Sequence, residues 1–219
     1  IVHAILTPTF ELHGIIPEHF GTRKSKTSLK DSHDETMLLL KLMGLENQIR
    51  VEDGASHAMP DENTPVDSPG ARLIIEEAMK DDDRPLHIAF YGPLTDMASA
   101  LLIEPKIEER NIRVIWIGGG AYPGGSREYN LSNDIPAANV VFKSSLEVWQ
   151  IPRNVYRLMP VGYAELIEKV RPHGEIGKYL VKQLIEFNSQ RKKPFEYRAL
   201  GDSPAVGVII YPECGSWEW

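Results

Sequence analysis

The sequence contains little cysteine, no excess of basic residues and no long apolar run. Its single cysteine, Cys214, excludes an intrachain disulfide framework and fits a reducing, cytoplasmic setting. Lys and Arg number 24 against 31 Asp and Glu, a formal net charge of −7. This balance argues against nucleic acid or an anionic membrane surface as a partner, because phosphate binding needs clustered cations. No apolar run approaches the roughly 18 residues of a transmembrane helix.

The pattern of apolar residues predicts one α/β domain over residues 1–219. We expect strands at residues 10–16, 48–51, 86–91, 113–117 and 146–151. We expect helices at residues 1–6, 71–80, 95–102, 135–142, 164–170, 176–187 and 202–210, and one that Asp31 or Ser32 caps and Gly44 ends. Residues 52–70 should form an irregular loop. Strands that alternate with helices indicate right-handed βαβ units, and hence a mostly parallel, Rossmann-like sheet flanked by helices.

Polar groups follow two of the expected strands, where open α/β sheets place their ligand sites. Residues 91–96 read Tyr-Gly-Pro-Leu-Thr-Asp, and residues 118–120 are three glycines. The glycines lack the later Gly-Lys-Ser/Thr of a phosphate loop. They serve either a sharp turn off the strand or the close approach of a ligand, which a Cβ would block.

Four acidic, amide or hydroxyl side chains are candidates for a site. Glu128 and Asn130 are spaced i, i+2, so in an extended segment both point the same way. They fit either a polar loop or the paired hydroxyls of a sugar. Asp202 and Asp134 stand where helix N-caps are expected, and either Thr95 or Asp96 caps the helix that begins there.

These segments together resemble the inosine-uridine-preferring nucleoside hydrolase family. The family pattern has Gly-Pro-Leu-Thr-Asn, then Gly-Gly-Gly, then Glu-Phe-Asn and Asp-Pro-Glu-Ala-Ala, and residues 92–96, 118–120, 128–130 and 134–138 match it in order and approximate spacing. The resemblance implies an enzyme that hydrolyses the N-glycosidic bond of a nucleoside or related ribosyl compound, with bound calcium. It also implies a cytoplasmic homo-oligomer.

The resemblance assigns roles to single residues. Glu128 and Asn130 correspond to the ribose-binding pair, and we expect Asn154, just past the strand at residues 146–151, to reach the same pocket. The Thr95 carbonyl and Asp202 correspond to calcium ligands, and oxygen donors suit that ion.

The chain also departs from the family pattern. Gly201 replaces the histidine that helps the leaving base depart, and the family's Asp-x-Asp-x-x-x-Asp-Asp motif is not found. We therefore expect the chain to lack the first strand and the C-terminal portion of the domain. His19 is our candidate for the missing leaving-group acid; the alternative is an exposed loop histidine. A non-catalytic nucleoside- or sugar-binding relative and a glycan-associated protein remain alternative functions.

Overall fold

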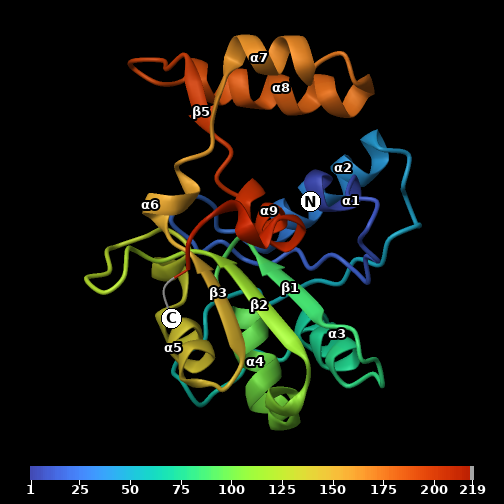
Figure 1. Ribbon diagram of the computed structural model, residues 1–219, viewed down its shortest axis with the longest axis vertical. Helices are drawn as coiled ribbons and strands as arrows, with labels where there is room; N and C mark the ends of the chain where they lie inside the picture. The colour runs from blue at the N-terminus through green and yellow to red at the C-terminus, as the bar shows by residue number, and fades with distance from the viewer. Residues whose placement is uncertain (218–219) are drawn as a thin grey trace.

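The computed structural model describes residues 1–217 and contains a parallel three-stranded sheet (Figure 1). Strands β1 (Leu86–Phe90), β2 (Ile112–Ile117) and β3 (Glu147–Ile151) lie in that order. Strand β2 lies between the other two and is buried at every position but one. Its nearly continuous apolar sequence is that of a strand covered on both faces. The predicted α/β fold with a parallel sheet flanked by helices is confirmed.

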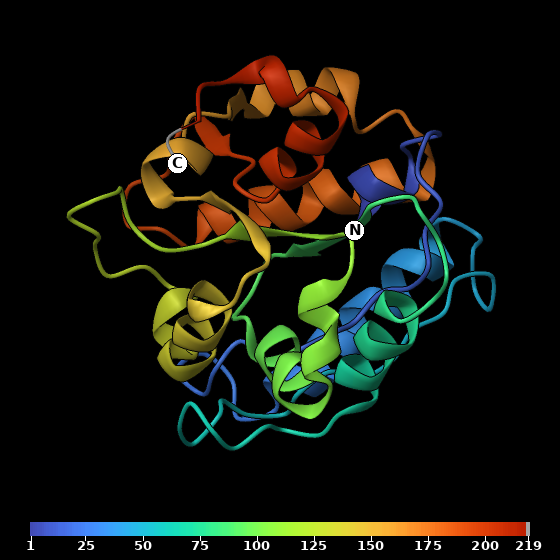
Figure 2. The same cartoon turned by 60° about the horizontal axis from the view of Figure 1, so that its bottom comes forward.

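Helices cover both faces of the sheet (Figure 2). Helices α3 (Pro69–Ala78), α4 (Thr95–Ile103) and α5 (Ile135–Lys143) pack on the face that presents Val114 and Trp116. Helix α9 (Ser203–Ile210) packs on the opposite face, against Ile115 and Ile117. The alternation of side chains along β2 thus supplies two separate apolar clusters.

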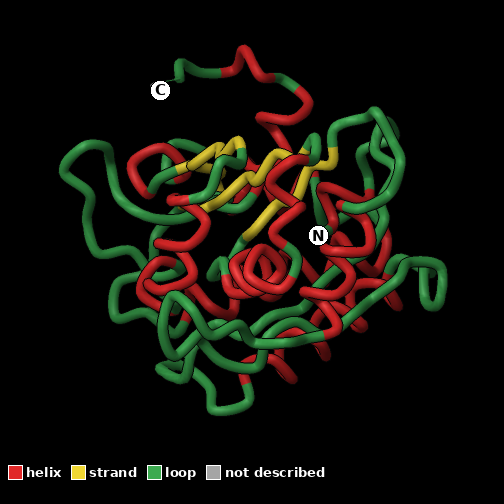
Figure 3. The backbone as a smooth tube through the Cα atoms, turned by 90° about the horizontal axis from the view of Figure 1, so that it is seen from below, coloured by secondary structure: helices red, strands yellow, loops and turns green. Residues whose placement is uncertain are grey.

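The remaining elements lie around this core. The short helices α1 (Val2–Ile5) and α6 (Arg153–Tyr156) flank it, and helix α2 (Ser28–Leu42) contacts α8 (Gly174–Ser189). Helix α8 packs with α7 (Tyr163–Lys169) beside an antiparallel pair, β4 (Pro160–Gly162) and β5 (Tyr197–Ala199). The 3₁₀ helices are η1 (Pro105–Glu109), η2 (Leu131–Asn133) and η3 (Pro212–Cys214). Much of the remaining chain is loop (Figure 3).

Two predicted strands are wrong. Residues 10–16 and 48–51 form only an isolated parallel bridge between Ile15 and Val51. Ile16 packs against the core, whereas Leu12 is exposed, and the backbone of these residues makes too few ladder hydrogen bonds for a strand. Helix α2 begins at Ser28, earlier than the predicted caps Asp31 and Ser32. The short elements α6, β4 and β5 were not predicted, because three or four residues carry too little periodicity.

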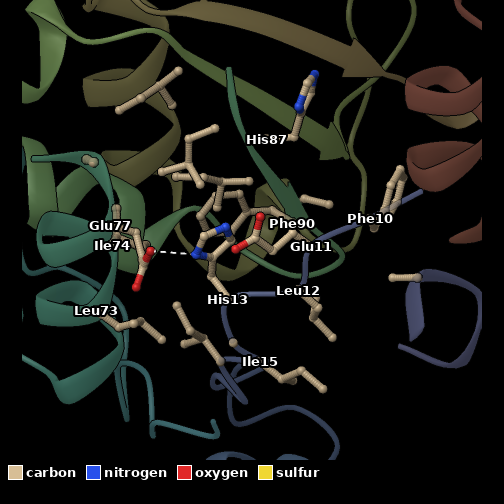
Figure 4. Close-up of a pocket in the computed structure, with 18 of the residues that line it drawn as sticks. Phe10, Glu11, Leu12, His13, Ile15, Leu73, Ile74, Glu77, His87 and Phe90 are labelled. Atoms are coloured by element: carbon tan, nitrogen blue, oxygen red, sulfur yellow. Dashed lines mark ion pairs between the residues drawn. The ribbon is translucent and has the colours of Figure 1, made fainter. Parts of the chain in front are cut away.

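A cavity of about 970 Å³ runs along β1 on the side away from β2 (Figure 4). Its walls include residues 9–18, side chains of α3 and β1 itself. Among residues 1–217, no strand pairs with this edge of β1. His13 and Glu77 form an ion pair of 2.7 Å across the cavity wall. No helix in the described part of the chain has the length and apolar character needed to cross a membrane.

Candidate functional site

Glu128 is held rigidly at the carboxyl end of β2. Its side chain is buried, and Oε2 accepts hydrogen bonds from the backbone amides of Gly119 (3.1 Å) and Leu131 (3.0 Å). Its Oε1 accepts a hydrogen bond of 3.1 Å from the phenol of Tyr156. A carboxylate has about four acceptor positions, so these three donors fix Glu128 and leave room for one more donor.

Asn130 joins the ends of β1 and β2. Its Nδ2 donates to the carbonyl oxygens of Tyr91 (3.0 Å) and Ile117 (2.7 Å). Both amide hydrogens are therefore used, and the orientation of the side-chain amide is set by them. No described residue donates to Oδ1, which remains an available acceptor beside Glu128.

Asp202 occupies the N-cap position of α9, but its side chain makes no capping hydrogen bond. Desolvation raises the pKa of Asp202, and the nearby Glu128 carboxylate raises it further, whereas Arg198 lowers it. Burial, together with the charge of Asp202, raises the pKa of Tyr91 to about 12. Asp202 therefore interacts electrostatically with both Glu128 and Tyr91.

Thr95 and His19 belong to a buried hydrogen-bonded chain. The Thr95 hydroxyl donates to Asp134 Oδ2 at 2.7 Å, and Nε2 of His19 lies 2.9 Å from the same hydroxyl oxygen. The Gly21 amide donates to Nδ1 of His19 at 3.2 Å. Since the threonine has one proton, we assign the neutral tautomer in which Nε2–H donates to Thr95. Burial lowers the pKa of His19 to about 4.

This geometry bears on the two alternatives for His19. The imidazole is buried, so it is not an exposed loop histidine. Both ring nitrogens are occupied, and a neutral imidazole at physiological pH is a poor proton donor. The arrangement favours a structural role that ties residues 17–21 to the start of α4. Asp134 caps α5 through the Ala137 amide, as predicted.

Asn154 lies on α6 and is exposed, and no contact in the described structure joins it to Glu128, Asn130 or Asp202. Its neighbour Tyr156, which sequence reasoning missed, reaches Glu128 instead. The only sequence signal for Tyr156 was its position shortly after the end of β3. A role for Asn154 in substrate binding stays a prediction.

The residues named for calcium do not form a complete site. Calcium takes six to eight oxygen ligands, but no group of three or more His, Cys, Asp or Glu side chains in residues 1–217 could hold a metal ion. No hydrogen bond joins Thr95 to Asp202 in the described structure. The described residues therefore do not complete a calcium site.

Comparisons with known proteins agree with the motifs. The family model for inosine-uridine preferring nucleoside hydrolases matches residues 2–218. A hydrolase of that description from Leishmania major is 27% identical over 159 residues, 70% of this chain and 50% of the relative. The pyrimidine-specific ribonucleoside hydrolase RihA of Salmonella paratyphi A is 24% identical over 183 residues, 80% of this chain and 58% of the relative.

A solved structure extends the comparison to the fold. The purine-preferring ribonucleoside hydrolase from Gardnerella vaginalis superposes with a TM-score of 0.79 at 21% identity, covering 98% of this chain and 77% of that one. The chain thus spans between half and three fifths of the length of the two curated relatives.

Proposed function

The chain belongs to the inosine-uridine preferring nucleoside hydrolase family, and from this premise we propose that it binds a ribosyl compound and hydrolyses its N-glycosidic bond. The observation that carries the proposal is the pair of Glu128 and Asn130 at the carboxyl ends of β1 and β2. Each is held by backbone groups and each keeps an acceptor position free. Two fixed acceptors side by side suit the hydroxyls of a ribose.

Fixed acceptors contribute to catalysis by positioning the sugar. Departure of the base leaves positive charge on the ribose ring, as in other glycoside cleavage. Negative charge on the Glu128 carboxylate would stabilise this positive charge as it develops. The chain's own residues therefore account for sugar binding and part of the electrostatics.

Calcium remains an expectation from the family. A calcium ion, when bound, would hold sugar hydroxyls and activate a water molecule. The described residues do not complete its site, so we assign no step to it. The proposal that the domain includes one further strand is supported by the free edge of β1 and the cavity beside it. Homo-oligomeric assembly, a single domain and a cytoplasmic location likewise remain proposals.

A second candidate is a non-catalytic relative that binds a nucleoside or sugar. The absence of a three-ligand group among residues 1–217 favours it. In this case Glu128 and Asn130 would hold the ribose, but no water molecule would be activated.

Two measurements on the chain separate these candidates. The first is cleavage of p-nitrophenyl riboside, with and without added calcium; the second is calorimetric binding of ribose and inosine. The variants are Glu128→Gln and Asn130→Ala, with exposed Asn154→Ala as a matched amide variant that also tests the predicted role of Asn154. Cleavage that both site variants abolish supports the hydrolase, and binding without cleavage supports the non-catalytic relative. If the chain shows neither binding nor cleavage, both candidate functions are contradicted.

A further inference from the structure

A second cavity, of about 230 Å³, includes in its wall Ser132 and Asn133, which follow Glu128 and Asn130 in the chain. Its walls come from the loop before α2, from residues 56–58 and from the end of η2. Ser132 in η2 links the two sites, because its amide and its hydroxyl both donate to the carbonyl oxygen of Glu128. The volume corresponds to roughly seven water molecules at about 30 Å³ each, so it accommodates a compact polar group.

The lining of this cavity is cationic in a chain that is anionic overall. Arg23 and Lys26 supply the positive charge of the lining, which neutral His19, His57 and several hydroxyl side chains complete, and no Asp or Glu is among its described lining residues. The sequence contains 31 acidic against 24 basic residues. The carboxylate of Asp31, in the first turn of α2, accepts a hydrogen bond from Thr27 and does not line the cavity.

Several hydrogen-bond donors in the lining have few or no acceptors among the described residues. Lys26 forms no ion pair or hydrogen bond with any described residue. Arg23 uses one terminal nitrogen, which donates to Asn133 Oδ1 (3.3 Å) and weakly to the Tyr129 carbonyl (3.5 Å), and its guanidinium lies over the Tyr129 ring. The Nδ2 of Asn133 is buried with no partner in the described structure. An unpaired buried donor is costly and calls for an acceptor.

The N-terminus of α2 adds positive electrostatic potential to the cavity. Buried Ser28 is both the first residue of this 15-residue helix and part of the cavity wall. No side chain caps the helix, so its first amide groups contribute positive partial charge there. Arginine, lysine and free helix amides together are the donors that proteins use for phosphate groups.

We propose that this cavity binds the phosphate group of a phosphorylated ribosyl compound whose sugar lies at Glu128 and Asn130. The ribose part of this inference rests on the proposed function, but phosphate binding in the cavity does not. A phosphate monoester carries the charge and the acceptor oxygens that Arg23, Lys26 and the helix start can satisfy. The substrate class would then be anionic ribosides rather than unmodified nucleosides.

The test is calorimetric titration of the full chain at low salt with inorganic phosphate, ribose 5-phosphate and ribose. The variants are Arg23→Gln and Lys26→Gln. The matched control is Lys24→Gln, because Lys24 lies on the same loop and over the same Tyr129 ring but does not line the cavity. Each of these changes removes one positive charge from an exposed side chain, so all three variants should fold.

We expect ribose 5-phosphate to bind more tightly than either phosphate or ribose. Each cavity variant should weaken binding of both phosphate ligands about tenfold, and Lys24→Gln should change it little. Equal losses of phosphate affinity in all three variants would show that the effect comes from the overall charge of the protein, and would overturn the proposal. So would no phosphate binding at millimolar concentrations, or ribose 5-phosphate binding no tighter than phosphate. Tight, variant-sensitive ribose 5-phosphate binding without riboside cleavage would uphold it while the proposed hydrolase function fails.

Discussion

The phenol of Tyr156 donates a hydrogen bond of 3.1 Å to Glu128 Oε1, and the same ring lies against Gly201. A Cβ on residue 201 would lie 3.2 Å from Cδ2 of that ring. The space beside Gly201, where the family has a histidine, is therefore bordered by a tyrosine from α6. Burial, and then the Glu128 charge, raises the pKa of Tyr156 to about 12, so its proton stays available to Glu128 at neutral pH.

Tyr156→Phe should weaken riboside binding while leaving the fold intact. It removes one donor to a carboxylate, a bond that contributes on the order of 1.5–3 kcal/mol, and frees Glu128 to rotate. We expect ribose affinity to fall about tenfold and the free energy of unfolding to fall by about 1.5–3 kcal/mol. Calorimetry and urea unfolding measure the two effects. Tyr122→Phe, at an exposed tyrosine, is the control, and an equal loss in both variants would contradict the assignment.

Stability should fall on acidification because His19 is buried in its neutral form. Its pKa is lowered from 6.5 to about 4, so the folded state binds fewer protons than the unfolded state between these values. The contribution of neutral His19 to the free energy of unfolding is fully present above pH 6.5 and is lost as the pH falls toward 4. This loss is roughly 3 kcal/mol at most.

Urea unfolding of the wild type and His19→Gln across that pH range isolates this group. The variant should show a smaller loss of stability on acidification. Identical pH dependence in the wild type and His19→Gln would show that His19 does not titrate as described.

Gly118→Ala should destabilise the turn after β2. A Cβ there would lie 2.2 Å from the Trp116 indole, whereas a Cβ at Gly124 meets nothing within 4 Å. Because the indole is fully buried and donates to the Gly92 carbonyl, it cannot move aside freely. We expect a loss of about 1–3 kcal/mol for Gly118→Ala and little change for Gly124→Ala. Thermal unfolding of both variants checks this, and equal midpoints would contradict it.

Sequence patterns predicted the central sheet because its strands are apolar, bounded by turn residues and separated by amphipathic helices. They predicted a strand at residues 10–16 that is not formed, because apolar side chains alone do not provide a neighbouring strand to pair with. For the candidate site, the i, i+2 spacing drew attention to Glu128 and Asn130, but not to the backbone groups that fix them. Tyr156 was missed because it comes from another segment, and only folding brings it to Glu128.

The choice of leaving group is the sharpest remaining test of the proposed hydrolase. Gly201 supplies no imidazole, and His19 is buried with both ring nitrogens occupied. A general acid contributes typically a hundred- to ten-thousand-fold, so inosine should be cleaved far more slowly than p-nitrophenyl riboside, whose phenolate departs unaided. We expect His19→Gln to leave the ratio of kcat/KM for the two substrates unchanged. We expect Tyr156→Phe to lower both values together, because Tyr156 acts through the position of Glu128. Rapid inosine cleavage that His19→Gln abolishes would instead assign the acid to His19.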